Sequence, residues 1–463
     1  MRAVTLATTL AILLAGPVAA GSAAPAEDEA VLKLRAYLRV PTVNPPGAEE
    51  AGARLIASWL KAEGLAPELV RCAPGRAAVF ATLRGTGAER PLMLLHHIDV
   101  VPVERSRWRH EPFGGELRDG AIWGRGALDM KGLGVMMAVA FLRLHRERRP
   151  LRRDVVLAAT PDEEAGGDVG VRWLLAHEPR RFDVSEVLNE GGAGLMLKRG
   201  RSLMGVQTAE RGALWVRATA HGDTGHGSRE RPDSAPRRLL RAMARLEASR
   251  RPLAFTPETR AMLAAFADAE EGLPALALRA VTWPGFLPLL GPRLIAAEPA
   301  LGPLLGDTLN PTVLRAGEKT NVMPGAASAE LDMRLLPGHP AAEALAWLQA
   351  ATAVPGDPPL TWVVLHQKES SSSPAAGPLW DGLTAGVAAV YPDTPVLPIL
   401  TPGGGTDSAF LRPLGIKALG CLPILASQAQ IDTIHGDDEH LTVEQLQRGT
   451  EVVYRALVHA AGL

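Results

Sequence analysis

The chain has 463 residues, of which 47% are hydrophobic and 21% charged, and its formal net charge is −1. This length exceeds a single compact core, so two domains are expected, and the ordinary globular composition excludes an intrinsically disordered chain. A net charge close to zero gives no reason to expect a nucleic-acid partner.

The first 24 residues have the pattern of an export signal. Arg2 precedes an apolar run at 3–15, and small residues follow at Ala19 and Ala20, an order typical of a cleaved signal peptide. The run is short for a membrane span, although a single preceding charge leaves an uncleaved anchor as the alternative. We therefore expect a signal peptide at 1–24, an exported (periplasmic or secreted) protein, and no stable membrane span in the mature chain.

The two cysteines, Cys72 and Cys421, leave two states open. In an oxidising compartment they could form a disulfide, and two buried free thiols agree at least as well with their isolated positions.

In chain order, the apolar pattern first predicts an α/β arrangement. From Glu27 to about Leu60 the pattern is helical, with breaks at Pro41 and at 44–47. Predicted strands follow at 77–83, 92–95 and 154–159, and predicted helices at 131–146 and 170–177. Such alternation indicates helices packed on a sheet.

The pattern changes after about residue 200. Residues 205–220 and 329–336 alternate apolar and polar side chains, which is typical of half-buried antiparallel strands. Between them lie a predicted helix at 235–248 and a stretch rich in Pro, Leu and Ala at 252–310. We therefore expect an α/β domain made of residues 25–202 and 339–463, interrupted by an inserted α+β domain at 203–338.

A histidine and an aspartate follow the predicted strand at 92–95, in the segment LLHHID. His97 and Asp99 point to the same side of an extended chain, and a metal-bound imidazole usually needs a carboxylate or carbonyl on its other nitrogen. His97 is therefore a better ligand than His96. A strand-end His and Asp that satisfy surface hydrogen bonds are the alternative.

Acidic residues follow the predicted strand at 154–159 in the turn PDEEAGG. Asp162, Glu163 and Glu164 would repel one another unless a cation lay among them. A carboxylate ligand beside a carboxylate base is the combination that metal-activated water requires. An exposed acidic turn is the alternative.

Three further turns supply one candidate ligand each. Asp129 lies in GRGALDMKG, Glu190 in NEGG and His435 in IHGDDE. Asp129 could instead cap the helix that follows it, and the other two could lie in surface turns. Together with His97 and the acidic turn, these residues form a nitrogen and oxygen ligand set for two divalent metal ions. Imidazole with carboxylate suits Zn²⁺, with Co²⁺ or Mn²⁺ as alternatives.

The ordered motifs resemble one known family along nearly the whole mature chain. HHIDVVPV, GRGALDMKG, PDEEAGG, NEGG, GGTDS and IHGDDE are similar, in order, to the motifs of a co-catalytic zinc peptidase family. That family contains aminoacylase, glutamate carboxypeptidase (G type), carboxypeptidase S, acetylornithine deacetylase and succinyl-diaminopimelate desuccinylase. The long Pro-rich stretch and Glu190 are most similar to the branch of carboxypeptidase S and N-acyl amino acid hydrolases.

This resemblance implies a fold and a role for each motif residue. The fold would be a zinc-peptidase catalytic domain, with a mixed sheet flanked by helices, interrupted by a ferredoxin-like lid that also forms a homodimer. The implied metal ligands are His97 and Glu190 on one ion, Glu164 and His435 on the other, and Asp129 between them. Asp99 would orient His97, and Glu163 would be the general base.

The resemblance also implies contacts from the inserted domain and from a glycine-rich loop. His226 would stabilise the oxyanion, reaching the partner subunit's site. Asn321, Arg334, Gly404 and Gly405 would bind the substrate carboxylate, for which a guanidinium is a natural clamp. The alternatives are a loop histidine, a salt bridge between Arg334 and Asp332, and a plain glycine turn.

Two features depart from the family pattern. His96 replaces the small residue usual before the ligand histidine, which makes a misassigned ligand conceivable. The apolar residues of the Pro-rich stretch could line an acyl pocket, contact a membrane or form the core of the inserted domain; they are Trp283, Phe286, Leu287, Leu289 and Leu290.

We therefore expect a hydrolase that cleaves an amide or peptide bond next to a free carboxylate, in a small peptide or an N-acyl amino acid, by metal-activated water. An aminopeptidase with the same metal core would need an acid to bind the free α-amine, where this chain offers Arg334. A catalytically inactive binding protein on the same scaffold would be expected to have lost Glu163 or a ligand, and all are present.

Overall fold

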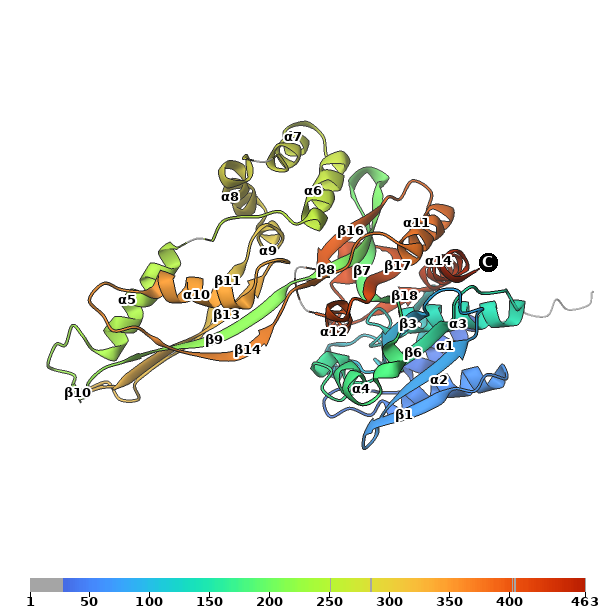
Figure 1. Cartoon of the computed structure of the whole chain (residues 1–463), viewed down its shortest axis with the longest axis horizontal. Coiled ribbons are helices and arrows are strands. Elements are labelled where there is room, and N and C mark those ends of the chain that lie inside the picture. Colours follow the sequence, from blue (N-terminus) through green and yellow to red (C-terminus); the bar gives the residue numbers. More distant parts are fainter. Residues whose placement is uncertain (1–27, 250, 284, 402, 404, 463) are drawn as a thin grey trace, which may run out of the picture.

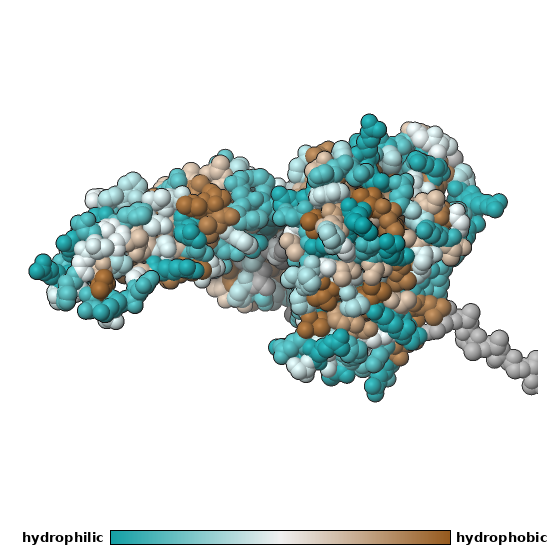
Figure 2. All heavy atoms as spheres, turned by 90° about the horizontal axis from the view of Figure 1, so that it is seen from below, coloured by the Kyte–Doolittle hydropathy of each residue, from teal (hydrophilic) through white to brown (hydrophobic). Residues whose placement is uncertain are grey.

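A computed structural model describes residues 28–462, apart from 250, 284, 402 and 404. The predicted signal peptide therefore lies outside the described residues. The chain forms two lobes, a larger α/β domain and an elongated smaller domain (Figure 1), which meet at a narrower junction when seen from below (Figure 2). No helix in the described part of the chain is both long enough and apolar enough to cross a membrane.

The larger domain is built on a nine-stranded mixed sheet. The strand order is β1 (Glu68–Ala73), β2 (Arg76–Leu83), β6 (Val155–Thr160), β3 (Leu92–His97), β7 (Glu186–Met196), β17 (Lys417–Ala426), β8 (Ser202–Glu210) and β15 (Ser371–Ser372), with β16 (Val396–Thr401) beside β8. Because β6, β3 and β7 are parallel, their carboxyl ends meet at one edge of the sheet.

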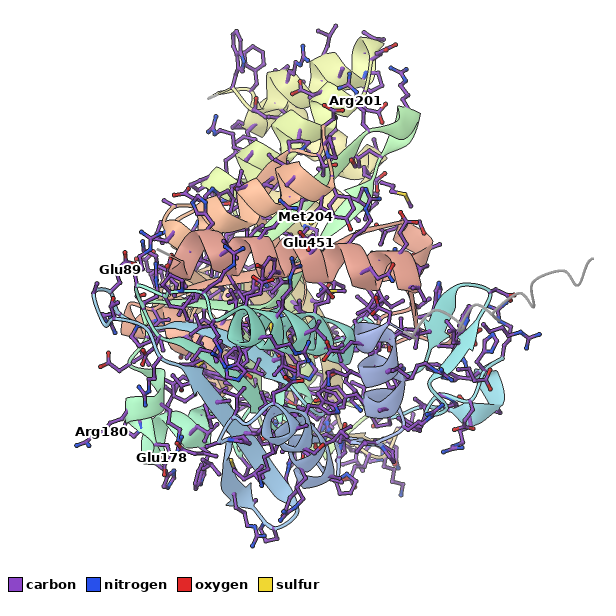
Figure 3. All side chains as sticks on the ribbon, turned by 90° about the vertical axis from the view of Figure 1, so that its right-hand side faces the viewer. Glu89, Glu178, Arg180, Arg201, Met204 and Glu451 are labelled. Atoms are coloured by element: carbon purple, nitrogen blue, oxygen red, sulfur yellow. The ribbon has the colours of Figure 1, made fainter. Side chains whose placement is uncertain are left out.

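Helices cover both faces of this sheet, because alternate residues of each strand point to opposite sides. Leu92 and Leu94 of β3 face a core formed with α1 (Glu29–Leu38), α2 (Glu50–Ala62), α3 (Lys131–Glu147), α11 (Pro378–Val390) and α14 (Val443–Ala461). Met93 and Leu95 face α4 (Val171–His177) and α12 (Ser408–Leu411). Figure 3 shows the molecule from the side of the helical layer that contains α3, α11 and α14, with Glu451 of α14 near the centre of the view.

A small three-stranded sheet and a short helix complete the larger domain. The sheet has the order β18 (His440–Thr442), β5 (Ala121–Trp123) and β4 (Glu116–Arg118), and the helix is α13 (Gln428–Ile431). Pairing of β18 with β5 brings the C-terminal segment beside the loop that precedes α3.

The smaller domain is built on a four-stranded antiparallel sheet. Its order is β11 (Thr308–Ala316), β13 (Ala326–Leu335), β9 (Gly212–His221) and β14 (Thr361–Lys368), and α5 (Ala235–Ala248) and α10 (Ala341–Thr352) cover one face. Four further helices form a separate small core: α6 (Pro257–Ala269), α7 (Gly272–Val281), α8 (Leu287–Ala297) and α9 (Gly302–Leu305). β10 (Gly225–His226) pairs with β12 (Val322–Met323) at the tip, away from the larger domain (Figure 1).

The elements predicted from the apolar pattern agree with the structure, including the helix at 235–248, which is α5. The boundaries of the inserted domain differ from the predicted 203–338. β8 belongs to the larger sheet, whereas α10 and β14 belong to the smaller domain, so its elements run from Gly212 to Lys368. Helix–strand alternation looks the same whichever sheet a strand joins, so the pattern could not place these elements.

Two open alternatives now have structural answers. Cys72 and Cys421 are free thiols, and Cys421 is buried. In the Pro-rich stretch, Leu287 is buried in the small core and Leu290 packs against it, while Leu289 is 58% exposed. The stretch therefore forms a core of its own and also exposes apolar surface.

Candidate active site and metal centre

The candidate ligands meet at the edge where β6, β3 and β7 end. His97 is the last residue of β3, Glu164 lies in the turn after β6, and Glu190 lies within β7. Asp129 comes from the loop before α3, and His435 from the loop between α13 and β18. The carboxyl edge of parallel strands is where α/β sheets commonly gather functional side chains.

Two imidazoles contact opposite oxygens of Asp129. His97 Nε2 lies 3.0 Å from Asp129 Oδ1, and His435 Nε2 lies 3.1 Å from Asp129 Oδ2. His97 Nε2 is also 3.6 Å from Glu190 Oε1, and His435 Nε2 is 3.1 Å from Glu164 Oε2. Asp129 therefore joins two groups, each made of one imidazole and one further carboxylate.

These distances fit two divalent metal ions. A tetrahedral ion with bonds of about 2.0 Å holds neighbouring donor atoms roughly 3.3 Å apart, and the four distances above span 3.0–3.6 Å. Among the described residues, Glu164 Oε1 is buried with no hydrogen-bond partner, a costly state that a metal bond would relieve. The donor atoms of His97, Asp129 and Glu164 all lie within 4.8 Å of one another, as do those of His97, Glu163 and Glu190.

The pKa values of the cluster reflect its concentrated negative charge. Contacts with Asp129 and Glu164 raise the pKa of His435 to about 10. Burial and the charge of Asp129 raise the pKa of Glu190 to about 8. Burial and the charge of Glu190 raise the pKa of Glu163 well above the usual carboxylate value. A cation among these groups would take over the role of the bound protons.

His97, and not His96, faces this cluster. His96 is fully buried on the opposite side of β3, where a Cβ at Gly134 of α3 would come within 2.5 Å of its ring. Its ring centroid lies 6.3 Å from that of Tyr37 in α1. The strand alternation therefore sends His96 into the helical layer, and the unusual residue at this position does not displace His97.

Asp99 positions the acidic turn. Its carboxylate accepts hydrogen bonds from the backbone N–H groups of Glu163 (3.2 Å) and Glu164 (3.1 Å) and from Asn44 Nδ2 (2.9 Å). The oxygen nearest to His97 Nδ1 is the Asp99 carbonyl at 2.9 Å, while the carboxylate is 3.6 Å away. Asp99 therefore orients His97 through its backbone, and its carboxylate holds the two glutamates.

Asp162, the first acid of the turn, faces inward. Its φ is 74°, and its carboxylate accepts hydrogen bonds from Val169 N (2.8 Å) and Asn44 Nδ2 (3.0 Å) and pairs with Arg76 at 2.8 Å. This arrangement leaves Glu163 and Glu164 to face the cluster. The sequence placed Asn44 in a Pro-rich break and gave no sign of its contact with the turn.

Glu439 is a second supporting residue that sequence reasoning did not single out. It is fully buried and accepts hydrogen bonds from Arg125 Nη1 (2.7 Å) and from the N–H groups of Gly126 (2.9 Å), Leu128 (2.7 Å) and Asp129 (3.0 Å). These bonds fix the loop that carries Asp129. The run IHGDDE contains three acids, and nothing in the run shows which one is buried.

The other predicted site residues are not brought to the cluster. His226 pairs in register with Val322 at the tip of the smaller domain, and Asn321 lies beside it, accepting a hydrogen bond from Gly227 N at 2.9 Å. That tip points away from the larger domain (Figure 1). Arg334 lies at the other end of the sheet, on β13, and donates to Asp332 at 2.8 and 3.1 Å, as the structural alternative predicted.

The glycine-rich loop is described only in part. Gly404 lies outside the described residues. Gly405 lies so close to Lys368 that a Cβ added at Gly405 would collide with Lys368 Nζ. Thr406, the next residue, donates a hydrogen bond from Oγ1 to Glu210 at 2.6 Å. The loop is therefore tied to the junction between the two domains.

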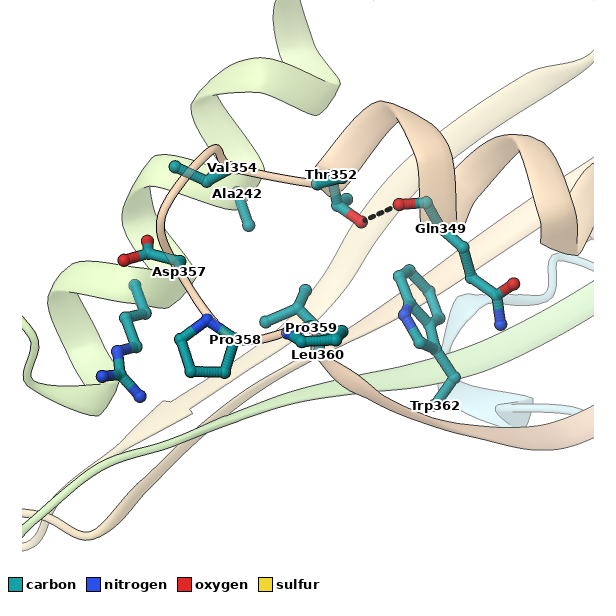
Figure 4. A pocket seen from close by; sticks show the side chains of 11 residues that line it. Ala242, Gln349, Thr352, Val354, Asp357, Pro358, Pro359, Leu360 and Trp362 are labelled. Carbon is teal, nitrogen blue, oxygen red and sulfur yellow. Dashed lines mark hydrogen bonds between the residues drawn. The ribbon is translucent and has the colours of Figure 1, made fainter.

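A cavity of 310 Å³ lies elsewhere, between α5 and α10 in the smaller domain (Figure 4). Apolar groups such as Ala242, Leu360 and Trp362 line it. The carboxylate at its rim, Asp357, is already paired with Arg241 at 2.7 Å. This cavity offers no group that would carry out hydrolysis, so the chemistry belongs to the cluster at the sheet edge.

Comparison with known proteins identifies the family of the chain. Residues 93–459 match the sequence model of Peptidase family M20/M25/M40. The chain belongs to this family. Aminoacylase-1 of Sus scrofa is 27% identical over 440 residues, which cover 93% of this chain and 95% of that protein. The N-fatty-acyl-amino acid synthase/hydrolase PM20D1 of Xenopus tropicalis is 29% identical over 367 residues, 77% of this chain and 70% of that protein.

A solved structure shows the same fold. An M20 family metallo-carboxypeptidase, Sso-CP2 from Sulfolobus solfataricus, superimposes with a TM-score of 0.68 at 19% identity, covering 94% of this chain and 99% of that one. The predicted family and fold class are thereby confirmed, and the chain is a metal-dependent hydrolase of amide or peptide bonds.

Proposed function

We propose that this hydrolase is a zinc enzyme that cleaves the amide bond of an N-acyl amino acid or small peptide bearing a free carboxylate. The observation that carries the proposal is Glu163 beside a cluster in which Asp129 joins two imidazole–carboxylate groups. The donor set suits zinc. The names of the two relatives, an aminoacylase and an N-fatty-acyl-amino acid synthase/hydrolase, favour N-acyl amino acids over peptides.

Each residue of the cluster has a role in this proposal. His97 and Glu190 would hold one ion and Glu164 and His435 the other, and Asp129 would contribute a carboxylate oxygen to each. Such a pair of ions supplies activation of a water molecule and polarisation of the scissile carbonyl. Glu163 takes a proton from the attacking water and delivers it to the leaving nitrogen. The raised pKa of Glu163, caused by burial and the charge of Glu190, suits a group that must hold a proton between these steps.

The active unit in this proposal is a homodimer. His226 and Asn321 lie at a tip that points away from the cluster of their own chain, so a second subunit is the simplest recipient. β14 lies at an edge of the four-stranded sheet, with Val363, Val364 and Leu365 between 41% and 47% exposed, and this lobe presents apolar surface (Figure 2). An exposed apolar edge strand readily pairs with a second copy. His226 would then donate a hydrogen bond to the developing oxyanion.

We also propose that residues 1–24 direct export. The support is the N-terminal order of one charge, an apolar run and small residues.

Hydrolysis of matched substrates by the purified, zinc-loaded protein tests the proposed reaction. The substrates are N-acetyl and N-lauroyl amino acids and C-terminally free dipeptides, each with its amidated counterpart. We expect turnover of the free-carboxylate compounds alone. Glu163→Gln should lower kcat by about 10²–10⁴-fold, because it removes the general base, without changing the zinc content.

Glu178→Gln is the matched control, since Glu178 is a surface glutamate of the same domain (Figure 3), and we expect no change in kcat. Equal turnover of acids and amides, or a requirement for a free α-amine, would contradict the proposal.

A further inference from the structure

Lys368 lies where the two domains join. It is the last residue of β14. Its ammonium lies so close to the glycine-rich loop that a Cβ added at Gly405 would collide with Lys368 Nζ. Lys368 Nζ also lies 3.7 Å from Glu210 Oε2 and 5.8 Å from the ring centroid of Phe410. Its side chain is 26% exposed. The ammonium is therefore partly shielded, yet reachable from solvent beside the loop.

The ammonium of Lys368 retains its capacity to donate hydrogen bonds. A separation of 3.7 Å from Glu210 is too long for a hydrogen bond, and no side chain or carbonyl among the described residues accepts one from Lys368 Nζ. Glu210 Oε1 pairs with Arg412 at 3.3 Å and accepts a hydrogen bond from Thr406 at 2.6 Å, whereas Glu210 Oε2, the oxygen that faces Lys368, is buried with no hydrogen-bond partner among the described residues. An ammonium has three donors, so Lys368 can keep its ion pair with Glu210 and also bind an anion.

Arg334 differs from Lys368 in this respect. Its Nε and Nη2 groups donate to the two carboxylate oxygens of Asp332, at 2.8 and 3.1 Å. This bidentate pair uses the face of the guanidinium that would otherwise grip a substrate carboxylate. Of these two cations, Lys368 is therefore the one whose hydrogen-bond donors are unused in this conformation.

The loop beside Lys368 leads directly to the reacting groups. Asp407, two residues after Gly405, accepts a hydrogen bond from Thr160 Oγ1 at 3.4 Å, and Thr160 ends β6 just before the acidic turn. Lys368 and Glu163 both lie within electrostatic reach of Asp407. In an N-acyl amino acid the carboxylate carbon is only three bonds from the scissile carbonyl carbon. A cation for that carboxylate must therefore lie close to the metal centre, and the loop links Lys368 to that centre through Asp407 and Thr160.

We propose that Lys368 is a specificity-determining residue that binds the free carboxylate of the substrate at the Gly405–Thr406 loop. The inference rests on the proposed function and deepens it. The bound carboxylate bridges β14 of the smaller domain and the loop of the larger domain. Substrates without this charge leave Lys368 unsatisfied and bind weakly.

Calorimetric binding to the zinc-loaded full chain tests this assignment. The background variant is Glu163→Gln, which removes turnover, and the ligands are an N-acetyl amino acid and its amide. We expect Lys368→Met to weaken binding of the acid on the order of 10- to 100-fold, as for loss of a hydrogen bond between charged groups, and to leave the amide unchanged. Lys368→Arg should restore most of the affinity. Lys61→Met, which removes an exposed lysine of α2, is the matched control.

With Glu163 intact, Lys368→Met should raise KM for the acid while kcat stays within severalfold. Unchanged affinity for the acid would overturn the assignment, as would equal weakening of acid and amide, which would mark Lys368 as a structural counter-ion of Glu210. These outcomes are separate from failure of the proposed function, which would appear as absence of turnover when both Glu163 and Lys368 are present.

Discussion

The metal centre and the smaller domain hold their functional residues in different ways. Around the centre, the supporting groups are buried and hydrogen-bonded several times over: Asp99 accepts three hydrogen bonds and Glu439 four. In the smaller domain, His226 is exposed and its Nδ1 lies 2.7 Å from Ser228 Oγ, while Arg334 pairs with a residue two positions away. Buried networks are rigid, and exposed groups with local partners rearrange easily. The reaction centre is thus preorganised in each chain, and we expect the proposed substrate contacts of the smaller domain to be completed by movement or by a partner.

Removal of the metal from the preorganised centre is expected to have the largest effect, on both activity and stability. A chelator should abolish hydrolysis, and zinc should restore it. The melting temperature should fall on removal, because clustered carboxylates would again repel one another, and metal at 100 times its Kd stabilises a fold by about 2.7 kcal/mol. Elemental analysis and calorimetry would check both effects. Full activity in protein shown to be metal-free would refute a catalytic metal centre.

The affinity of the centre for metal should depend on pH. In the metal-free protein the pKa of His435 is raised to about 10 and that of Glu190 to about 8, so both groups carry a proton at neutral pH. Metal binding must release these protons, and its affinity should rise with pH, by about tenfold per pH unit for each proton released. Calorimetry in buffers of different ionisation enthalpy measures the number released.

His226→Ala tests whether the exposed tip completes the site. Loss of one oxyanion donor should lower kcat by about 10²–10³-fold with little change in zinc affinity, since His226 is remote from the cluster. Mixing this variant with Glu163→Gln decides which subunit it serves. Random exchange should restore about a quarter of wild-type activity, because half of the dimers are mixed and each has one complete site. No recovery would exclude action across subunits.

The candidate metal ligands could be predicted because each stands in a short motif. His97 and Glu164 follow strands that the apolar pattern marks, and parallel strand ends meet at one edge, whereas Glu190, predicted in a turn, lies within β7. Their supports could not be predicted. Asn44 lies 118 residues from Asp162, and Glu439 lies 310 residues from Asp129. Such hydrogen bonds depend on the three-dimensional fold and leave no local pattern.

The smaller domain was harder to predict for a related reason. A strand such as β14 is compatible with either sheet, and its pairing with β9 is a long-range contact without a sequence signal. The partner of Arg334 could be anticipated, because Asp332 is two residues away on the same face of a strand. The position of Lys368 could not, since it depends on how the two domains join.

Glu439→Gln tests whether the preorganisation of the centre depends on its buried supports. The amide keeps the shape of the side chain, but replaces one acceptor with a donor that faces the N–H groups of the Asp129 loop. We expect zinc affinity to fall by about 10- to 100-fold, as for other groups that orient metal ligands. Competition with a chromophoric chelator measures this. Glu444→Gln, which alters an exposed residue paired with Arg448 in α14, should have no effect. Unchanged zinc affinity in Glu439→Gln would show that the loop holds its shape without this support.

The smallest expected effect concerns the pair between Arg334 and Asp332. The two side chains are 34% and 29% exposed, and such a pair contributes about 0.2–1 kcal/mol. If Arg334 leaves Asp332 and joins Lys368 at the substrate carboxylate, Asp332→Asn should lower KM for free-carboxylate substrates by up to about fivefold, since RT is about 0.59 kcal/mol. KM for amides should stay constant. Glu330→Gln, which weakens the neighbouring pair with Arg217 at 2.8 Å, is the control. A higher KM in Asp332→Asn would mean instead that Asp332 aims the guanidinium at the substrate, so that the smaller domain is preorganised at this point as the metal centre is.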